Sequence, residues 1–244
     1  FFSVFNFAAQ AGVRYSIKEP KKYIESNIQG YFNILECIKK YKINKLFYAS
    51  SSSVYGERKK FPTSEIENLK PTNVYSLSKT FNESITEIYS KLHGIDSIGL
   101  RFFTVYGEWG RPDMFLFKIF YSILTKKIFQ LNNSGNHSRD FTYINDVNII
   151  LEKLLKRKLK KKGHQVFNIC SSKTINIRNL ISLIKKTNKI KVKNVSRNSA
   201  DLLKTHGSNK KLIKMIGTFK FEDINNIIND IFEWYRKNKI HKLT

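Results

Sequence analysis

Cysteine is scarce in this sequence, with two residues among 244. Cys37 falls in a predicted helix and Cys170 ends a predicted strand, so the two form neither a disulfide framework nor a zinc-binding pattern. No metal site is predicted. We expect both cysteines to be buried as small apolar side chains in a reducing cytoplasm.

Long apolar runs are also absent. No stretch reaches the roughly 18 residues that a membrane-spanning helix needs, and no signal-peptide pattern opens the chain. The hydrophobic fraction of 41% is still enough to bury a sizeable core, which excludes a disordered protein. The chain begins at Phe1 rather than at Met, inside a predicted buried strand, and we expect it to be a fragment.

Acidic residues are few: 19 Asp and Glu stand against 44 Lys and Arg, giving a net charge of +25. Nucleic-acid-binding proteins have a similar balance. Here, however, the lysines are spread along the chain. The densest run, 156–162, falls at the end of an amphipathic helix, where cations complement the helix dipole. We therefore interpret the charge as a solvated surface and predict no nucleic-acid partner.

Short apolar runs alternate with helical patterns, which is typical of parallel βαβ units. We therefore predict an α/β fold whose C-terminal half leaves the regular alternation. Strands are expected at 4–7, 45–49, 97–104 and 166–170, with a loop at 8–16. Helices are expected at 23–40, 73–93, 114–125, 145–158, 177–188 and 221–237.

The strongest helical pattern covers residues 73–93, with Gly94 beyond its end. Tyr75 and Lys79 lie beside its apolar stripe, four residues apart and therefore on one face. A lysine ammonium beside a phenol favours the phenolate, so this pair suits general base catalysis near neutral pH. Alone the spacing is common by chance, and an ordinary surface pair is the alternative. The stripe consists of Val74, Leu77, Phe81, Ile85, Ile88 and Leu92.

Polar loops follow three successive strands. Residues 8–16, 50–56 and 102–107 each begin where an apolar run ends. The carboxyl ends of parallel strands are where α/β folds bind ligands. A serine run such as 50–53 is also compatible with a flexible turn. Its place between a buried strand and the Tyr75–Lys79 helix favours a cleft instead.

Five segments carry a resemblance to a known family: AAQAGVRYS (8–16), YASSSSVYG (48–56), YSLSK (75–79), LRFFTVYGEWGRPDM (100–114) and RDFTYINDV (139–147). Together they resemble the extended short-chain dehydrogenases/reductases of the NAD-dependent epimerase/dehydratase family, most closely the UDP-glucuronate 4-epimerases. The resemblance covers nearly the whole chain, and 100–114 is its most specific part.

The resemblance implies a mechanism on one tightly bound NAD. Tyr75, as a phenolate, removes the proton from the sugar 4-hydroxyl while hydride leaves carbon 4, and Ser51 hydrogen-bonds the same oxygen. The 4-keto sugar then turns and receives the hydride on its other face. Lys79 binds the nicotinamide ribose and holds down the pKa of Tyr75.

The resemblance also implies binding residues. Arg111 would pair with a hexuronate carboxylate and Arg139 with the nucleotide diphosphate, although a structural ion pair is the alternative for each. Related dehydratases and decarboxylases carry acidic residues where this chain has Ser52 and Ser53, which favours epimerisation. The other substrate contacts would be Ser52, Ser53 and Thr104. The NAD contacts, besides Tyr75 and Lys79, would be Phe7, Ala8, Ala9, Gln10, Asn27 and Phe102.

The chain also departs from the family pattern. It lacks the glycine-rich turn that brings a pyrophosphate to a helix N-terminus. We therefore expect roughly two βα units to be missing before Phe1, and NAD binding by this chain alone to be weak. Asn6 stands where the family has His, Glu108 replaces a Pro, and residues 197–201 match the late Arg-x-Gly-Asp segment only in part.

These features predict the rest of a Rossmann-type NAD-binding domain in 1–104 and a mixed substrate lobe in 105–244, with 139–170 returning to the Rossmann part. We expect a cytoplasmic, NAD-dependent 4-epimerase that converts UDP-glucuronate to UDP-galacturonate, with no membrane insertion. The helix at 73–93 is expected to serve a homodimer interface, with burial inside one subunit as the alternative. The other hypotheses are a UDP-galactose or UDP-N-acetylhexosamine 4-epimerase, a non-catalytic truncated family member, and a basic nucleic-acid-binding protein.

Overall fold

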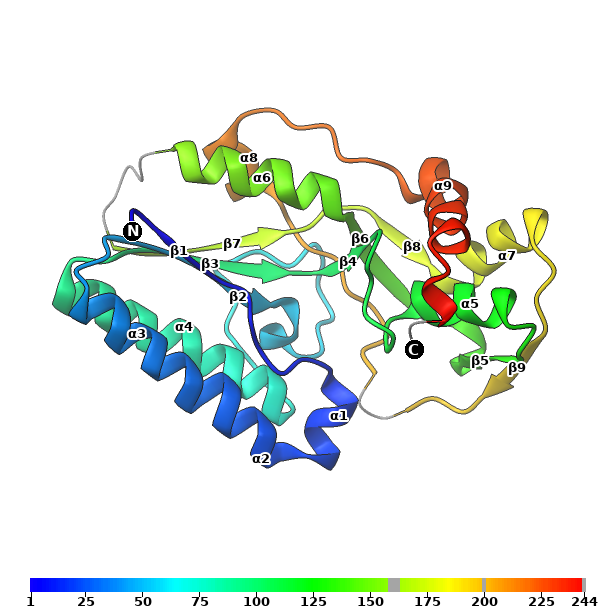
Figure 1. The fold of residues 1–244 in the computed structure, drawn as a ribbon, viewed down its shortest axis with the longest axis horizontal. Coiled ribbons are helices and arrows are strands. Elements are labelled where there is room, and N and C mark those ends of the chain that lie inside the picture. Colours follow the sequence, from blue (N-terminus) through cyan, green and yellow to red (C-terminus); the bar gives the residue numbers. More distant parts are fainter. Residues whose placement is uncertain (158–162, 199–200, 243–244) are drawn as a thin grey trace.

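The computed structural model describes residues 1–157, 163–198 and 201–242. Its main sheet has four parallel strands in the order β1–β2–β3–β7 (Figure 1). This parallel sheet, with helices on both faces, confirms the predicted α/β class. The strands are β1 (Val4–Asn6), β2 (Lys45–Ser51), β3 (Asp96–Phe102) and β7 (His164–Ile169).

Helices α3 (Gly30–Lys40) and α4 (Val74–His93) cover one face of this sheet, and α6 (Ile144–Lys156) and α8 (Lys210–Ile216) cover the other (Figure 1). Each face has its own apolar core. Leu35 of α3 packs with Leu46 and Tyr48 on the first face. Ile150 of α6 packs with Phe47 and Leu212 on the second. The helix α8 was not predicted.

The second half of the chain builds smaller sheets beside the main one (Figure 1). One joins β4 (Thr104–Tyr106), β6 (Ser138–Tyr143) and β8 (Thr174–Asn176), and the other pairs β5 (Phe129–Asn132) with β9 (Val192–Val195). Helices α5 (Phe115–Leu124), α7 (Ile177–Thr187) and α9 (Ile224–Lys237) enclose a core with many aromatic side chains. The four helices expected between 114 and 237 are confirmed, with ends shifted by a few residues.

The segment after β1 differs from the prediction. The expected loop at 8–16 contains the start of α1 (Val13–Lys18), and the expected helix at 23–40 is divided into α2 (Pro20–Tyr23), a π-helix (Ile24–Gln29) and α3. A π-helical turn holds an extra residue and therefore rotates the faces on either side of it. As a result Tyr23, Asn27 and Tyr31 are buried.

The same rotation leaves Ile24 exposed, and Cys37 on α3 is exposed as well. The predicted burial of Cys37 is therefore wrong, whereas that of Cys170 is confirmed. Of the lysine run 156–162, residues 158–162 lie outside the described part of the chain, and α6 ends at Lys156. Within the described ranges, no helix has the length and apolarity needed to cross a membrane.

Helix α4 begins and ends as predicted. Asn73 caps its first turn by accepting from the Ser76 backbone N–H, and Gly94 ends it in the left-handed conformation with φ 66°. Its buried face is largely polar, unlike the buried face of an ordinary amphipathic helix. The buried residues are Ser76, Ser78, Lys79, Asn82, Glu83, Thr86 and Ser90, while Leu77, Ile88 and Leu92 of the apolar stripe are exposed.

Candidate functional site

Parallel pairing brings the carboxyl ends of β1, β2 and β3 to one edge of the main sheet. Ser51, the last residue of β2, lies opposite Phe102, the last residue of β3. Phe7, just beyond β1, packs edge-on against Phe102 with ring centroids 5.9 Å apart. The predicted convergence of these strand ends is therefore present, and it defines the candidate site.

Ser51 is held at this edge by the turn that follows it. The chain leaves β2 in a short 3-10 turn, Ser52–Tyr55, which Ser51 caps by accepting from the Ser53 backbone N–H at 3.2 Å. The Ser53 hydroxyl also donates to the Ser51 Oγ, at 2.9 Å. Ser51 is 8% exposed, so its hydroxyl is fixed and faces inward.

Tyr75, in the first turn of α4, lies beside Ser51, whose hydroxyl lowers the pKa of the phenol. Burial raises the pKa of Tyr75, and the Ser51 hydroxyl and the Arg111 charge act in the opposite direction, while Asp113 adds to the increase. The net upward shift is opposite to the predicted lowering.

Lys79 lies one turn after Tyr75 and is 3% exposed. Its ammonium donates to the Ala49 carbonyl at 2.8 Å, and burial lowers the pKa of Lys79 to about 8. An ammonium has three N–H donors, and in the described part of the chain one of them is used in this way. The remaining donors and the buried charge fit the vicinal hydroxyls of a nicotinamide ribose.

Asn27, in the π-helix, holds the loop after β1 at the same edge. Its side chain accepts from the Gln10 backbone N–H at 2.7 Å and donates to the Gln10 carbonyl at 2.8 Å. It also donates to Ser78 of α4 at 3.0 Å. Ala8 and Ala9, between Phe7 and Gln10, are exposed and present backbone to the edge. Of the residues predicted to contact NAD, Asn27 and Gln10 are thus hydrogen-bonded to each other, and Asn27 is also hydrogen-bonded to Ser78, which precedes Lys79 on α4.

Arg111 belongs to a loop between β4 and α5. It is 47% exposed and makes a two-point pair with Asp113, Nε to Oδ1 at 3.0 Å and Nη2 to Oδ2 at 3.2 Å. The carboxylate of Asp113 lies close to Gly12, where an added Cβ would be 3.4 Å from Oδ2. The loop therefore reaches the segment after β1 and passes beside Tyr75.

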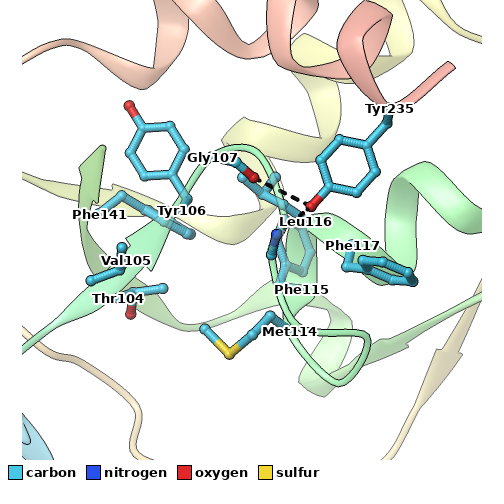
Figure 2. A pocket seen from close by; sticks show the side chains of 11 residues that line it. Thr104, Val105, Tyr106, Gly107, Met114, Phe115, Leu116, Phe117, Phe141 and Tyr235 are labelled. Atoms are coloured by element: carbon cyan, nitrogen blue, oxygen red, sulfur yellow. Dashed lines mark hydrogen bonds between the residues drawn. The ribbon is translucent and has the colours of Figure 1, made fainter. Parts of the chain in front are cut away.

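Tyr235 of α9 fixes this loop from the other side. Its hydroxyl accepts from the Gly110 backbone N–H at 2.9 Å and lies 3.3 Å from the Gly107 carbonyl (Figure 2). A largely apolar pocket of about 290 Å³ opens beside it, lined by Thr104, Met114 and Phe115 among others (Figure 2). The predicted substrate residue Thr104 lies in this pocket.

Ser52 lines a different cavity, of about 230 Å³, so the structure does not bring it and Thr104 into one pocket. This cavity has basic walls, formed by Arg58, Lys204 and His206. None of these three was singled out in the sequence, because isolated basic residues in a chain with many lysines give no signal. Ser53 does not line either cavity and instead supports Ser51.

Arg139, on β6, donates to the Ser138 carbonyl at 2.9 Å. Burial lowers the pKa of Arg139 to about 10, and Asp201 acts in the opposite direction. Asp201 itself forms a two-point pair with Arg14, which sequence reasoning missed. Two guanidinium groups that share one nearby carboxylate leave positive charge uncompensated, which suits a diphosphate.

Known proteins share this arrangement. The profile of the NAD dependent epimerase/dehydratase family matches residues 2–170. An uncharacterized protein of Methanocaldococcus jannaschii is 41% identical over 239 residues, which are 97% of this chain and 72% of that protein. UDP-glucuronate 4-epimerase 3 of Arabidopsis thaliana is 35% identical over 96% of this chain and 59% of its own length. UDP-glucuronic acid 4-epimerase from Bacillus cereus, solved with UDP-glucuronic acid and NAD, matches 97% of this chain and 76% of that chain, with 27% identity and a TM-score of 0.90.

Proposed function

Because the chain belongs to the NAD dependent epimerase/dehydratase family, we propose that it catalyses the 4-epimerisation of a UDP-sugar, interconverting UDP-glucuronate and UDP-galacturonate. The observation that carries this proposal is the convergence of Ser51, Tyr75 and Lys79. Tyr75 lies beside Ser51, whose hydroxyl lowers its pKa, and Lys79 donates to the neighbouring Ala49 carbonyl from the same face of α4.

Tyr75 acts as the general base in this proposal. It removes the proton of the sugar 4-hydroxyl, and Ser51 hydrogen-bonds the oxygen that becomes the C4 carbonyl. After the keto sugar has turned over, Tyr75 returns the same proton to the C4 oxygen, which completes the epimerisation. NAD, which Lys79 would hold through its ribose hydroxyls, would supply the acceptor for the hydride of carbon 4 and its return to the opposite face. Lys79, one turn after Tyr75 on α4, binds the ribose hydroxyls with the N–H donors that the Ala49 carbonyl does not use.

The substrate diphosphate is assigned to Arg139 and Arg14, the two guanidinium groups beside Asp201. Arg111 is assigned to the hexuronate carboxylate. To bind it, the guanidinium leaves the carboxylate of Asp113 and pairs with that of the substrate. Thr104 and Ser52, which line the two cavities, are assigned to contacts with the sugar. One finding favours the alternative of a neutral hexose: the guanidinium of Arg111 is already neutralised by Asp113.

We further propose that residues 1–104 act as the NAD-binding part and 105–244 mainly as the substrate lobe, with 139–170 returning to the Rossmann part. The exposed apolar side chains of α4, Leu77, Ile88 and Leu92, support a homodimer through this helix.

The test is conversion of UDP-glucuronate by the native polypeptide, with UDP-galacturonate separated by anion-exchange chromatography. The control is Tyr75→Phe, which keeps the ring and removes the base. We expect conversion that the control abolishes. Equal conversion by both proteins would remove Tyr75 from the mechanism. NAD-bound protein without conversion would remove glucuronate and favour a neutral UDP-hexose.

A further inference from the structure

A buried ion pair lies one turn beyond Lys79. Glu83 of α4 and Arg101 of β3 have side chains that are 6% and 5% exposed. The guanidinium and the carboxylate are joined by two hydrogen bonds, Nε to Oε1 at 2.8 Å and Nη2 to Oε2 at 2.7 Å. The Ser50 hydroxyl donates to the same Oε1. Glu83 is thus held by two strands at once, through the residue next to Ser51 and through the next strand of the sheet.

The network continues away from α4. Arg101 Nη1 donates to the Tyr55 hydroxyl at 2.9 Å, and that hydroxyl donates to Asn168 Oδ1 of β7 at 2.6 Å. Asn168 in turn donates to the carbonyls of Thr63 and Ser208 at 3.0 and 3.1 Å. Helix α4 is therefore connected by directional bonds to three strands of the sheet and to the segment at Thr63, which lines the cavity beside Ser52.

Such a pair contributes little net stability. Taking two charges out of water costs several kcal/mol, and apolar side chains of similar volume in the same place are often neutral or stabilising. The best-attested use of a buried polar pair is to select one arrangement among several that apolar packing would allow. Helix α4 could pack on the sheet in more than one rotation about its own axis.

The buried face of α4 consists largely of small hydroxyl residues, whereas Leu77, Ile88 and Leu92 are exposed. Within the single chain, burial of these three side chains favours another rotation of this helix, whereas the proposed dimer would cover them in the observed one. Each residue of an α-helix advances it by roughly 100°, so a rotation by one position would move Tyr75 off Ser51. Residues 75, 79 and 83 share one face, so the bond at Glu83 orients the other two.

We infer that Glu83 and Arg101 are positioning residues, which select the rotation of α4 that directs Tyr75 to Ser51 and Lys79 to the Ala49 carbonyl. Neither residue touches the reacting atoms. The pair acts through Tyr75 and Lys79, and its kinetic role rests on the proposed function. Its structural role, the orientation of α4, does not.

The decisive variant replaces the pair by apolar side chains, Glu83→Met with Arg101→Met. The matched control is Glu87→Gln, one turn further along α4, where the side chain is 51% exposed and pairs with Lys91. We expect the melting temperature of the double variant to stay within about 5 °C of the parent. We expect kcat to fall by about tenfold or more while KM changes by less than about twofold. A crystal structure of the double variant should show the Tyr75 hydroxyl turned away from Ser51.

A double variant that is folded, keeps the kcat of the control and keeps both Tyr75 beside Ser51 and the bond from Lys79 to the Ala49 carbonyl overturns the inference. If the double variant does not fold, Glu83→Gln is judged by the same criteria. Absence of epimerase activity in the parent toward any UDP-sugar would instead remove the proposed function. In that case the crystal structures of parent and variant still decide whether the pair orients α4.

Discussion

The ring of Tyr23 packs edge-on against the ring of Tyr75, with centroids 6.1 Å apart and planes inclined at 76°. The Tyr23 hydroxyl lies 2.8 Å from the Ala11 carbonyl and 2.7 Å from that of Gly12. Tyr23 is 0% exposed. One side chain therefore joins the loop after β1 to the proposed general base.

The two parts of Tyr23 can be separated by substitution. Tyr23→Phe keeps the ring and removes the hydroxyl, so we expect the free energy of unfolding to fall by about 1 kcal/mol with kcat nearly unchanged. Tyr23→Ala also removes the ring, and we expect a loss of about 3 kcal/mol and a fall in kcat of about tenfold. Urea denaturation and steady-state kinetics measure both. If kcat fell equally in Tyr23→Phe and Tyr23→Ala, the hydroxyl of Tyr23, and not its ring, would support Tyr75.

The charge of Asp113 affects the ionisation of Tyr75. Its charge raises the pKa of Tyr75, whereas Arg111 lowers it. Since Tyr75 acts as a base only when deprotonated, activity increases as pH rises through its pKa. We expect Asp113→Asn to move the acidic limb of the kcat/KM profile to lower pH, with Asp230→Asn on α9 as the control. An acidic limb that moves to higher pH would contradict this electrostatic account.

Arg111 tests the identity of the sugar. A guanidinium paired with a carboxylate contributes about 1.5–3 kcal/mol, and half-exposure places Arg111 toward the lower end. We expect Arg111→Ala to reduce kcat/KM for UDP-glucuronate by about tenfold and to leave UDP-galactose within about twofold. Arg111→Lys, which keeps the charge without the planar fork, should lie between. Equal losses for both sugars would assign Arg111 to a group that they share.

Lys79 is expected to reduce the stability of the fold. Its pKa in the folded protein is about 8, below the ordinary value of 10.5, so below pH 8 the folded state holds a charge that burial disfavours. Lys79→Met should raise the free energy of unfolding at pH 7 by about 1–3 kcal/mol while abolishing activity.

The size of this effect depends on pH. Between pH 8 and 10.5 the unfolded chain binds more protons at Lys79 than the folded chain, so the parent gains stability as pH rises. The advantage of Lys79→Met therefore shrinks across that window and disappears above it. Denaturation curves at pH 7 and pH 10 measure the difference. An advantage that grows with pH would contradict the lowered pKa.

The exposed apolar side chains of α4 predict the state of assembly. We expect Ile88→Glu to shift the protein from dimer to monomer in light scattering, because a carboxylate would be buried in the proposed interface. Ile88 is 54% exposed in the single chain. The control is Ile128→Glu, at 57% exposure in the smaller lobe. If the parent protein is a monomer in light scattering, the proposed interface through α4 is wrong.

Local signals in the sequence predicted the family, the parallel sheet and the ends of α4. Asn73 and Gly94 mark those ends because a cap and a left-handed residue act within one turn. The rotation of α4 was not predictable in the same way. We infer that it depends on Glu83 pairing with Arg101 of another element, 18 residues away, and the apolar stripe does not identify the largely polar face that is buried.

The candidate site was predicted in the same uneven manner. Ser51, Tyr75 and Lys79 converge because strand ends and helical spacing are local properties. Arg14 beside Asp201 was missed, since the two residues are 187 positions apart. The strands β5 and β9 were missed because neither has an apolar run, and each depends on the other for its pairing.

The two bonds from Tyr235 to the Arg111 loop also bear on how the protein is made. Gly107 and Tyr235 are separated by 128 residues, so the ribosome produces the loop well before the helix that fixes it. Domains generally form from the N-terminal side during synthesis, and Ser51, Tyr75 and Lys79 belong to the earlier part. In the growing chain the proposed acid–base residues are therefore made first, and the loop proposed to recognise the sugar reaches its final shape only after α9 has been translated and docked.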